Sequence, residues 1–149
     1  MRIVFGLGVA AMALASCSQP KELSVDGAYI RLGAVTGRPA AAYFTVHGGP
    51  TPATLISVTT DVAIKAEMHE TMAKDGVTLM APLARVEIPA NTDVAFAPGG
   101  RHVMLFNMNP GIKPGARAML TFAFADGTRI LGNANVVAAG APAGTATAK

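Results

Sequence analysis

The chain has 149 residues, a single cysteine, a formal net charge of +3 and 14% charged residues. This length suits one domain of ordinary size. The basic residues are scattered, without the basic patch of a nucleic-acid-binding surface, so the composition gives no support for a nucleic-acid partner.

Residues 1–16 have the pattern of a lipoprotein signal peptide. Arg2 precedes an apolar run that is too short for a transmembrane helix, which needs about 20 apolar residues. The run ends in LASC, which resembles a bacterial lipobox, where the cysteine is lipidated after cleavage. We predict lipidation at Cys17 and a short tether over residues 17–22. The alternative is an ordinary signal peptide with a leftover cysteine.

Residues 23–137 have the pattern of an all-β domain, because short β-rich runs alternate with Gly/Pro turns. The expected strands are 23–31, 41–47, 54–60, 62–69, 77–80, 84–88, 92–97, 102–106, 117–124 and 128–137. Regular short strands favour an antiparallel sandwich or a Greek-key barrel. The small-residue end, 138–149, is predicted to be a disordered tail.

Two histidines and two methionines form the candidate metal site. Ten residues separate His69 from Met80, twenty-one separate Met80 from His102, and one separates His102 from Met104. Thioethers select copper(I), and imidazole suits copper as well. A thioether cannot be lost to a disulfide, which matters in the oxidising compartment that the signal peptide indicates. The pattern therefore predicts a copper(I) site.

Strand alternation predicts that these four side chains point away from the core. The expected core-facing residues of the three strands are Val62, Ile64, Ala66, Met68, Val77, Leu79, Val103 and Leu105. His69 is then an outward residue at a strand end, and Met80, His102 and Met104 also fall opposite the apolar stripe. Taken singly, each is more often a packing or surface residue. The shared outward direction favours a site.

Two further residues are weighed beside this set. Met72 lies three residues after His69 in an expected turn, where it is a candidate auxiliary soft contact. His47, in the turn VHGGP, is interpreted as a surface residue and not as a ligand.

Five segments carry a resemblance to a known family: GAYIRLG at 27–33, AAYFTVHGG at 41–49, MHETMAKDGVTLM at 68–80, VEIPANTDVAFAPGGRHVMLF at 86–106 and LTFAFADG at 120–127. Together with the ligand spacing, they resemble the periplasmic copper-chaperone family PCuAC. The resemblance covers roughly residues 23–137. It implies a cupredoxin-like Greek-key barrel with a copper(I) site near its surface.

The resemblance also implies a role and partners. Family members pass copper toward cytochrome c oxidase assembly, so a copper-accepting oxidase subunit or a thiol-bearing assembly factor is the expected partner. The alternative is a copper-sequestering or resistance lipoprotein that binds copper without delivering it. A blue-copper electron-transfer site needs a thiolate, and the sole cysteine stands at the lipid position. No catalytic triad, paired-carboxylate cleft or phosphate loop is present, so no enzyme is expected.

A periplasmic, membrane-anchored location follows from the signal and lipobox. Ser18 follows Cys17 where an aspartate would favour retention at the cytoplasmic membrane. By that sorting rule the outer membrane is slightly favoured.

Overall fold

The computed structural model describes residues 21–142, so the predicted signal peptide, Cys17, Ser18 and residues 143–149 lie outside the described residues. Ten strands form within this range, and each expected strand has a counterpart: β1 (Ser24–Arg31), β2 (Ala40–His47), β3 (Ala53–Thr60), β4 (Ala63–Lys74), β5 (Val77–Pro82), β6 (Val86–Ile88), β7 (Asp93–Phe96), β8 (Arg101–Met108), β9 (Arg117–Phe124) and β10 (Arg129–Val137). The all-β prediction is confirmed. No helix that could cross a membrane occurs between residues 21 and 142.

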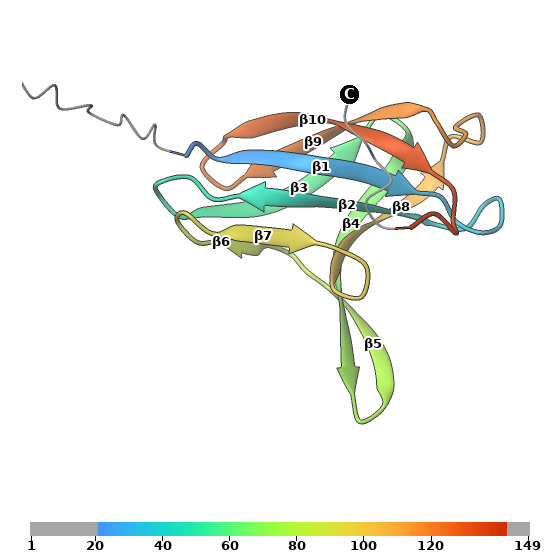
Figure 1. Cartoon of the computed structure of the whole chain (residues 1–149), viewed down its shortest axis with the longest axis horizontal. Helices are drawn as coiled ribbons and strands as arrows, with labels where there is room; N and C mark the ends of the chain where they lie inside the picture. Colours follow the sequence, from blue (N-terminus) through green and yellow to red (C-terminus); the bar gives the residue numbers. More distant parts are fainter. Residues whose placement is uncertain (1–20, 143–149) are drawn as a thin grey trace, which may run out of the picture.

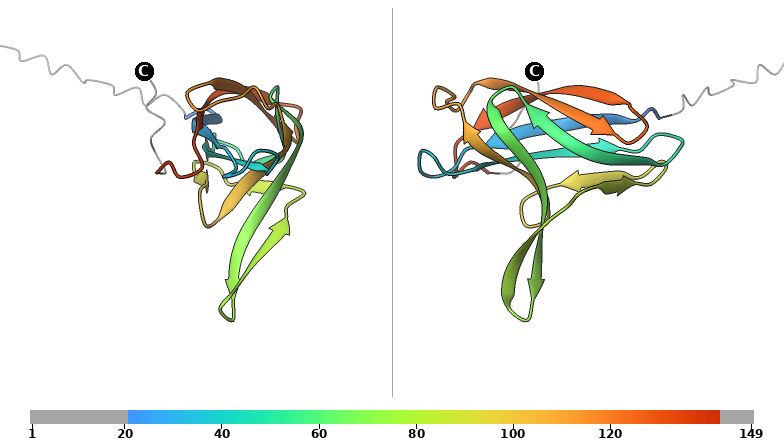
Figure 2. Two further views of the ribbon diagram at one scale, coloured as in Figure 1. Left: turned by 90° about the vertical axis from the view of Figure 1, so that its right-hand side faces the viewer. Right: turned by 180° about the vertical axis from the view of Figure 1, so that it is seen from behind.

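The strands belong to one sheet of order β5-β4-β8-β2-β1-β10-β9-β3-β6, with β7 paired to β2. The pairing of β1 with β10 is parallel, and the other pairings are antiparallel. Strand β2 divides the sheet, because Ala40–Ala42 pair with β8 while Phe44–His47 pair with β7. The sheet curls into a barrel from which the β4–β5 hairpin projects (Figure 1, Figure 2).

Alternating apolar residues fill the barrel. In β9, Leu120 and Phe122 are fully buried while Thr121 between them is only partly buried. The Phe44 ring stacks on Phe96 with centroids 4.3 Å apart and meets Phe122 edge-on at 4.7 Å. Each fully buried side chain of this kind contributes about 1.5–3 kcal/mol. This core holds the strands that carry the candidate site.

The β4–β5 hairpin projects beyond the barrel (Figure 1). Lys74 pairs with Val77, so the connection is the two-residue turn Asp75–Gly76. Both residues have positive φ, 52° and 75°, the conformation that lets an Asp-Gly turn match the twist of a hairpin. The prediction that Val77 and Leu79 face the core is wrong, since they are 57% and 47% exposed. No second layer of the described chain covers them.

Ile64 corrects a second core prediction. It is 84% exposed, although the next two residues on its side of β4, Ala66 and Met68, turn toward the core. Near the start of β4 the inward face opens at the end of the barrel. There Ile64 lines an open groove of about 920 Å³ together with the loops that follow β1 and β8. The alternation is correct, but no segment between residues 21 and 142 closes over Ile64.

Candidate metal centre

The strand register places all four predicted ligands on one face of β5-β4-β8. His69 on β4 pairs directly with His102 on β8, and Met104 pairs with Glu67, two residues before His69. On the other side of β4, Met80 pairs with Thr71, two residues after His69. Directly paired residues share a face, and alternate residues along a strand share it as well. His69 is therefore the centre of the set, with His102 opposite it and both methionines on its diagonals.

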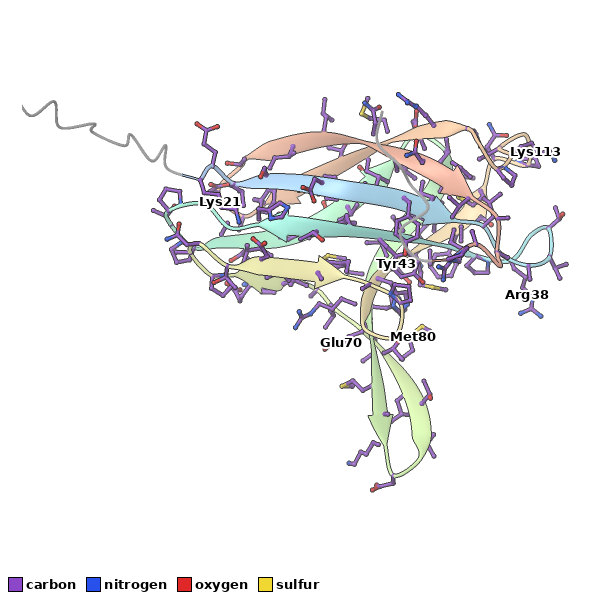
Figure 3. The ribbon with its side chains drawn as sticks, viewed as in Figure 1. Lys21, Arg38, Tyr43, Glu70, Met80 and Lys113 are labelled. Carbon is purple, nitrogen blue, oxygen red and sulfur yellow. The ribbon has the colours of Figure 1, made fainter. Side chains whose placement is uncertain are left out.

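This face lies where the hairpin leaves the barrel. Pairing of β4 with β8 ends at Glu70, and pairing of β4 with β5 begins at His69, so three strands overlap only there. The prediction that His69 ends its strand is wrong, because β4 continues to Lys74. Figure 3 shows Met80 at this junction, with Glu70 on the other side of the ribbon.

Burial falls steadily across the four residues. His102 is 5% exposed, His69 and Met104 are half-buried, and Met80 is 53% exposed. Between residues 21 and 142, His102 is the one buried residue with a polar or ionisable side chain apart from Tyr29 and Tyr43. The rings of His69 and His102 are 6.0 Å apart between centroids. The set thus has an inner, barrel-held side and an outer, accessible side.

A turn before β8 sets the tautomer of His102. Gly100 N donates to Ala97 O at 3.0 Å, and Gly99 has a φ of 83°, the arrangement of a type II Pro-Gly turn. The Gly100 carbonyl then lies 3.1 Å from His102 Nδ1. A carbonyl can only accept, so Nδ1 carries the proton and Nε2 keeps a lone pair. Nε2 is buried without a hydrogen-bond partner.

His69 has the opposite arrangement. Its Nε2 lies 3.4 Å from Oε2 of Glu67, and its Nδ1 is buried without a partner. Because the carboxylate accepts, this contact places the proton on Nε2 and leaves the lone pair on Nδ1. The Lys65 ammonium, and to a lesser degree His69, hold the pKa of Glu67 below its usual value. In each histidine, therefore, one ring nitrogen is hydrogen-bonded within the protein and the other has no hydrogen-bond partner.

These residues fit a soft metal ion. Two buried ring nitrogens without partners need an explanation, since burying an unpaired polar atom is costly. A metal bound through each free nitrogen, with the other held by a carbonyl or carboxylate, is the usual arrangement of histidine ligands. In the described part of the chain no three His, Cys, Asp or Glu side chains cluster to hold a metal.

Met72 and His47 lie outside this set. Met72 was expected in a turn but lies in β4, paired with Leu79, which puts it on the face of the hairpin opposite the four ligands. His47 ends β2, where its Nε2 and Nδ1 are each 2.9 Å from a carboxylate oxygen, of Asp26 and Asp93 respectively. Asp26, and then Asp93, raise the pKa of His47. Lys21 extends this cluster by a 2.7 Å ion pair with Asp93.

Three supporting residues were not identified from the sequence: Tyr43, Glu67 and Gly100. The Tyr43 ring lies 6.5 Å from the His102 ring and is buried on the same face. Glu67 stands two residues before a predicted ligand, so strand alternation could have placed it on the ligand face. The Gly100 carbonyl leaves no trace in residue type, although the Pro-Gly-Gly sequence at 98–100 predicts the turn that orients it.

The chain is similar in sequence to proteins that are described as lipoproteins. Residues 23–136 match the family described as "Putative lipoprotein LpqE-like". "Putative lipoprotein Lxx21020" of Leifsonia xyli subsp. xyli is 28% identical over 131 residues, which cover 85% of this chain and 79% of that protein.

Two solved structures share the fold. The copper-bound PCuAC domain from PmoF2 has a TM-score of 0.65 at 21% identity and covers 80% of this chain and 96% of that chain. The solution structure of CuI-DR1885 from Deinococcus radiodurans has a TM-score of 0.62 at 25% identity and covers 82% and 83%. The predicted PCuAC resemblance and the cupredoxin-like β fold are thereby confirmed.

Proposed function

The chain belongs to the LpqE-like lipoprotein family, and from that premise we propose that it is an extracytoplasmic metallochaperone for copper(I). The proposed ligands are His69, Met80, His102 and Met104. One observation carries the proposal: the register of β5-β4-β8 gathers these four residues on one face around His69. The structural neighbours whose names record bound copper, PmoF2 and DR1885, support it.

The ligand chemistry supports copper(I) as the cargo. Two thioethers and two neutral imidazoles favour a soft monovalent ion over the hard divalent ions that carboxylates select. None of the four ligands supplies an anionic sulfur, so the ion is held less tightly than in a thiolate site. That balance suits a protein that must give its copper away.

Exposure indicates how the copper would leave. Met80 is 53% exposed and sits on the hairpin, whereas His102 is buried against the barrel. An incoming ligand can therefore reach the ion from the Met80 side while His102 and Met104 still hold it. We propose ligand exchange with a thiolate-rich acceptor, either a copper-accepting oxidase subunit or a thiol-bearing assembly factor.

The proposed location is the periplasm, on a membrane. The family description and the Leifsonia relative's name both record a lipoprotein, which supports lipidation at Cys17. We propose that the lipid at Cys17 anchors the domain and that Ser18 directs it to the outer membrane. Mass spectrometry of the membrane-extracted protein would detect the lipid, and a Cys17→Ala variant recovered in the same membrane fraction would contradict the anchor.

Copper(I) titration against a chromogenic chelator tests the site. The domain of residues 22–149, which lacks the Cys17 thiol, is compared with the double variant Met80→Ala, Met104→Ala and with the control Met72→Ala, a methionine on the opposite face. We expect one copper(I) per chain, lost in the double variant and retained in the control. Binding that is indifferent to Met80 and Met104 would overturn the assignment.

Delivery is tested separately, in a strain that lacks the protein. Loss of oxidase activity at low copper supports delivery. Copper sensitivity with normal oxidase activity would instead identify a sequestering lipoprotein.

A further inference from the structure

A carboxylate without an assigned role stands beside the candidate centre. Glu67 lies on the ligand face of β4, paired across the sheet with Met104 and two residues from His69. Its Oε2 lies 3.4 Å from His69 Nε2, and its Oε1 lies 2.7 Å from Lys65 Nζ. The Lys65 ammonium is itself 5.4 Å from the centre of the Phe106 ring, its cross-strand neighbour. One carboxylate oxygen of Glu67 is thus paired with Lys65, and the other faces the His69 ring.

The two histidines differ in how they are oriented. The Gly100 backbone carbonyl holds His102 Nδ1, and the same carbonyl accepts the Thr71 amide at 3.1 Å, so this support is part of the sheet. His69 has no such backbone partner for its ring, and Glu67 is the side chain within hydrogen-bond distance of it. A neutral imidazole can carry its proton on either nitrogen, and the partner of one nitrogen decides which nitrogen is left to bind metal.

We propose that Glu67 is a positioning residue for copper(I) binding: its carboxylate accepts a hydrogen bond from His69 Nε2–H and so leaves Nδ1 to face the other three proposed ligands. The two histidines then bind through different nitrogens, Nδ1 of His69 and Nε2 of His102. These are the two ring nitrogens that the structure leaves buried and unpartnered at this face. The inference rests on the proposed function, since it assigns a role within that site.

Glu70 provides a matched control. It is adjacent to His69 on the same strand, its side chain is 32% exposed against 37% for Glu67, and it pairs with Arg101 at 3.4 Å. Strand alternation puts it on the opposite face, where it cannot reach the His69 ring. Removing Glu70 therefore takes the same charge from nearly the same place but leaves the hydrogen bond to His69 intact.

The test combines two readouts on residues 22–149, which lack the Cys17 thiol. Long-range ¹H–¹⁵N NMR of the copper-free protein reports which nitrogen of His69 carries the proton. We expect a single Nε2–H form in the wild type and in Glu70→Ala, and a mixture in Glu67→Ala. Copper(I) affinity should fall about 10-fold in Glu67→Ala, the loss typical of an outer partner of a histidine ligand. It should stay near the wild-type value in Glu70→Ala.

Glu67→Gln separates orientation from charge, because its amide oxygen still accepts a hydrogen bond. Recovery of most of the lost affinity in this variant supports positioning. Equal losses in Glu67→Gln and Glu67→Ala with an unchanged His69 tautomer would overturn the inference in favour of simple charge. Unchanged affinity in Glu67→Ala would also overturn it. Failure of the wild type to bind copper(I) is a different result, which removes the proposed function itself.

Discussion

The barrel and the β4–β5 hairpin have the same alternation of apolar residues. They differ in how deeply these apolar side chains are buried. Leu120 in β9 is fully buried, whereas Leu79 in β5 is 47% exposed. The barrel closes its strands around a shared interior, while the hairpin extends past the last strand that could cover it (Figure 1). The buried core of the barrel therefore stabilises the fold, and the exposed hairpin leaves one side of the candidate centre accessible.

The candidate centre draws on both regions. His102 and Met104 come from β8, within the barrel, and Met80 comes from the free strand of the hairpin. His69 stands between them, on the strand that both regions share. Because Met104 belongs to the barrel and Met80 to the hairpin, we expect the two methionines to contribute differently to copper(I) affinity and to copper(I) release.

Met104→Ala should give the largest loss. This proposed ligand is half-buried, and its backbone pairs on both sides, with Glu67 and Ala41. We expect copper(I) affinity to fall by more than the roughly 10–100-fold that loss of an outer partner costs. Chelator competition measures it. A loss smaller than that of Met80→Ala would break the comparison.

Leu120→Ala and Leu79→Ala compare the two regions without copper. Leu120→Ala should lower the free energy of unfolding by about 2–5 kcal/mol, because truncating this buried side chain leaves a cavity. The hairpin leucine should change stability by no more than about 0.5 kcal/mol, as at other surface positions. Urea unfolding monitored by circular dichroism gives both values. Similar losses in the two variants would mean that the hairpin is covered in solution.

Met80→Ala should weaken copper(I) binding by roughly 10-fold, about 1.4 kcal/mol, less than Met104→Ala. Because Met80 is the most exposed of the four proposed ligands, the change should appear mainly as faster release of copper(I) to an acceptor. Stopped-flow transfer to a chromogenic chelator measures the rate. An unchanged release rate would argue against exit from the hairpin side.

His47→Gln should have the smallest effect, confined to the barrel. Asp26, and then Asp93, raise the pKa of His47 above its usual value of about 6.5. A raised pKa in the folded state adds stability below the unfolded-state value, and this stability is lost as pH rises through the folded-state value. The wild type should therefore melt higher than the variant near about pH 5.5 and equally near about pH 9.

Differential scanning calorimetry of the copper-free proteins gives this comparison. A difference in melting temperature that grows toward high pH would contradict the assigned charge pairing. Copper(I) affinity at neutral pH should not change, because His47 contacts Asp26 and Asp93 and none of the four ligands.

Local sequence determined much of this molecule. Alternation in β8 puts Val103 and Leu105 inside and His102 and Met104 on the other face, as the structure has it. The Asp75–Gly76 pair determined the hairpin turn, since both residues tolerate positive φ. The types and spacing of the four candidate ligands are also sequence properties. These features depend on neighbours a few residues apart, and period-two alternation is enough to read them.

Tertiary structure decided the rest. Alternation assigns Val77, Leu79 and Ile64 to a face but does not say whether another strand covers that face, and here none does. The pairing of β4 with β8 and β5 is likewise non-local, and it alone puts His69 between His102 and Met80. The burial of His102 depends on the distant strands that pair with β8. The side of a strand to which a residue points follows from alternation along the chain. Whether that side is covered, and which residues lie next to it, depends on which distant segments pack together.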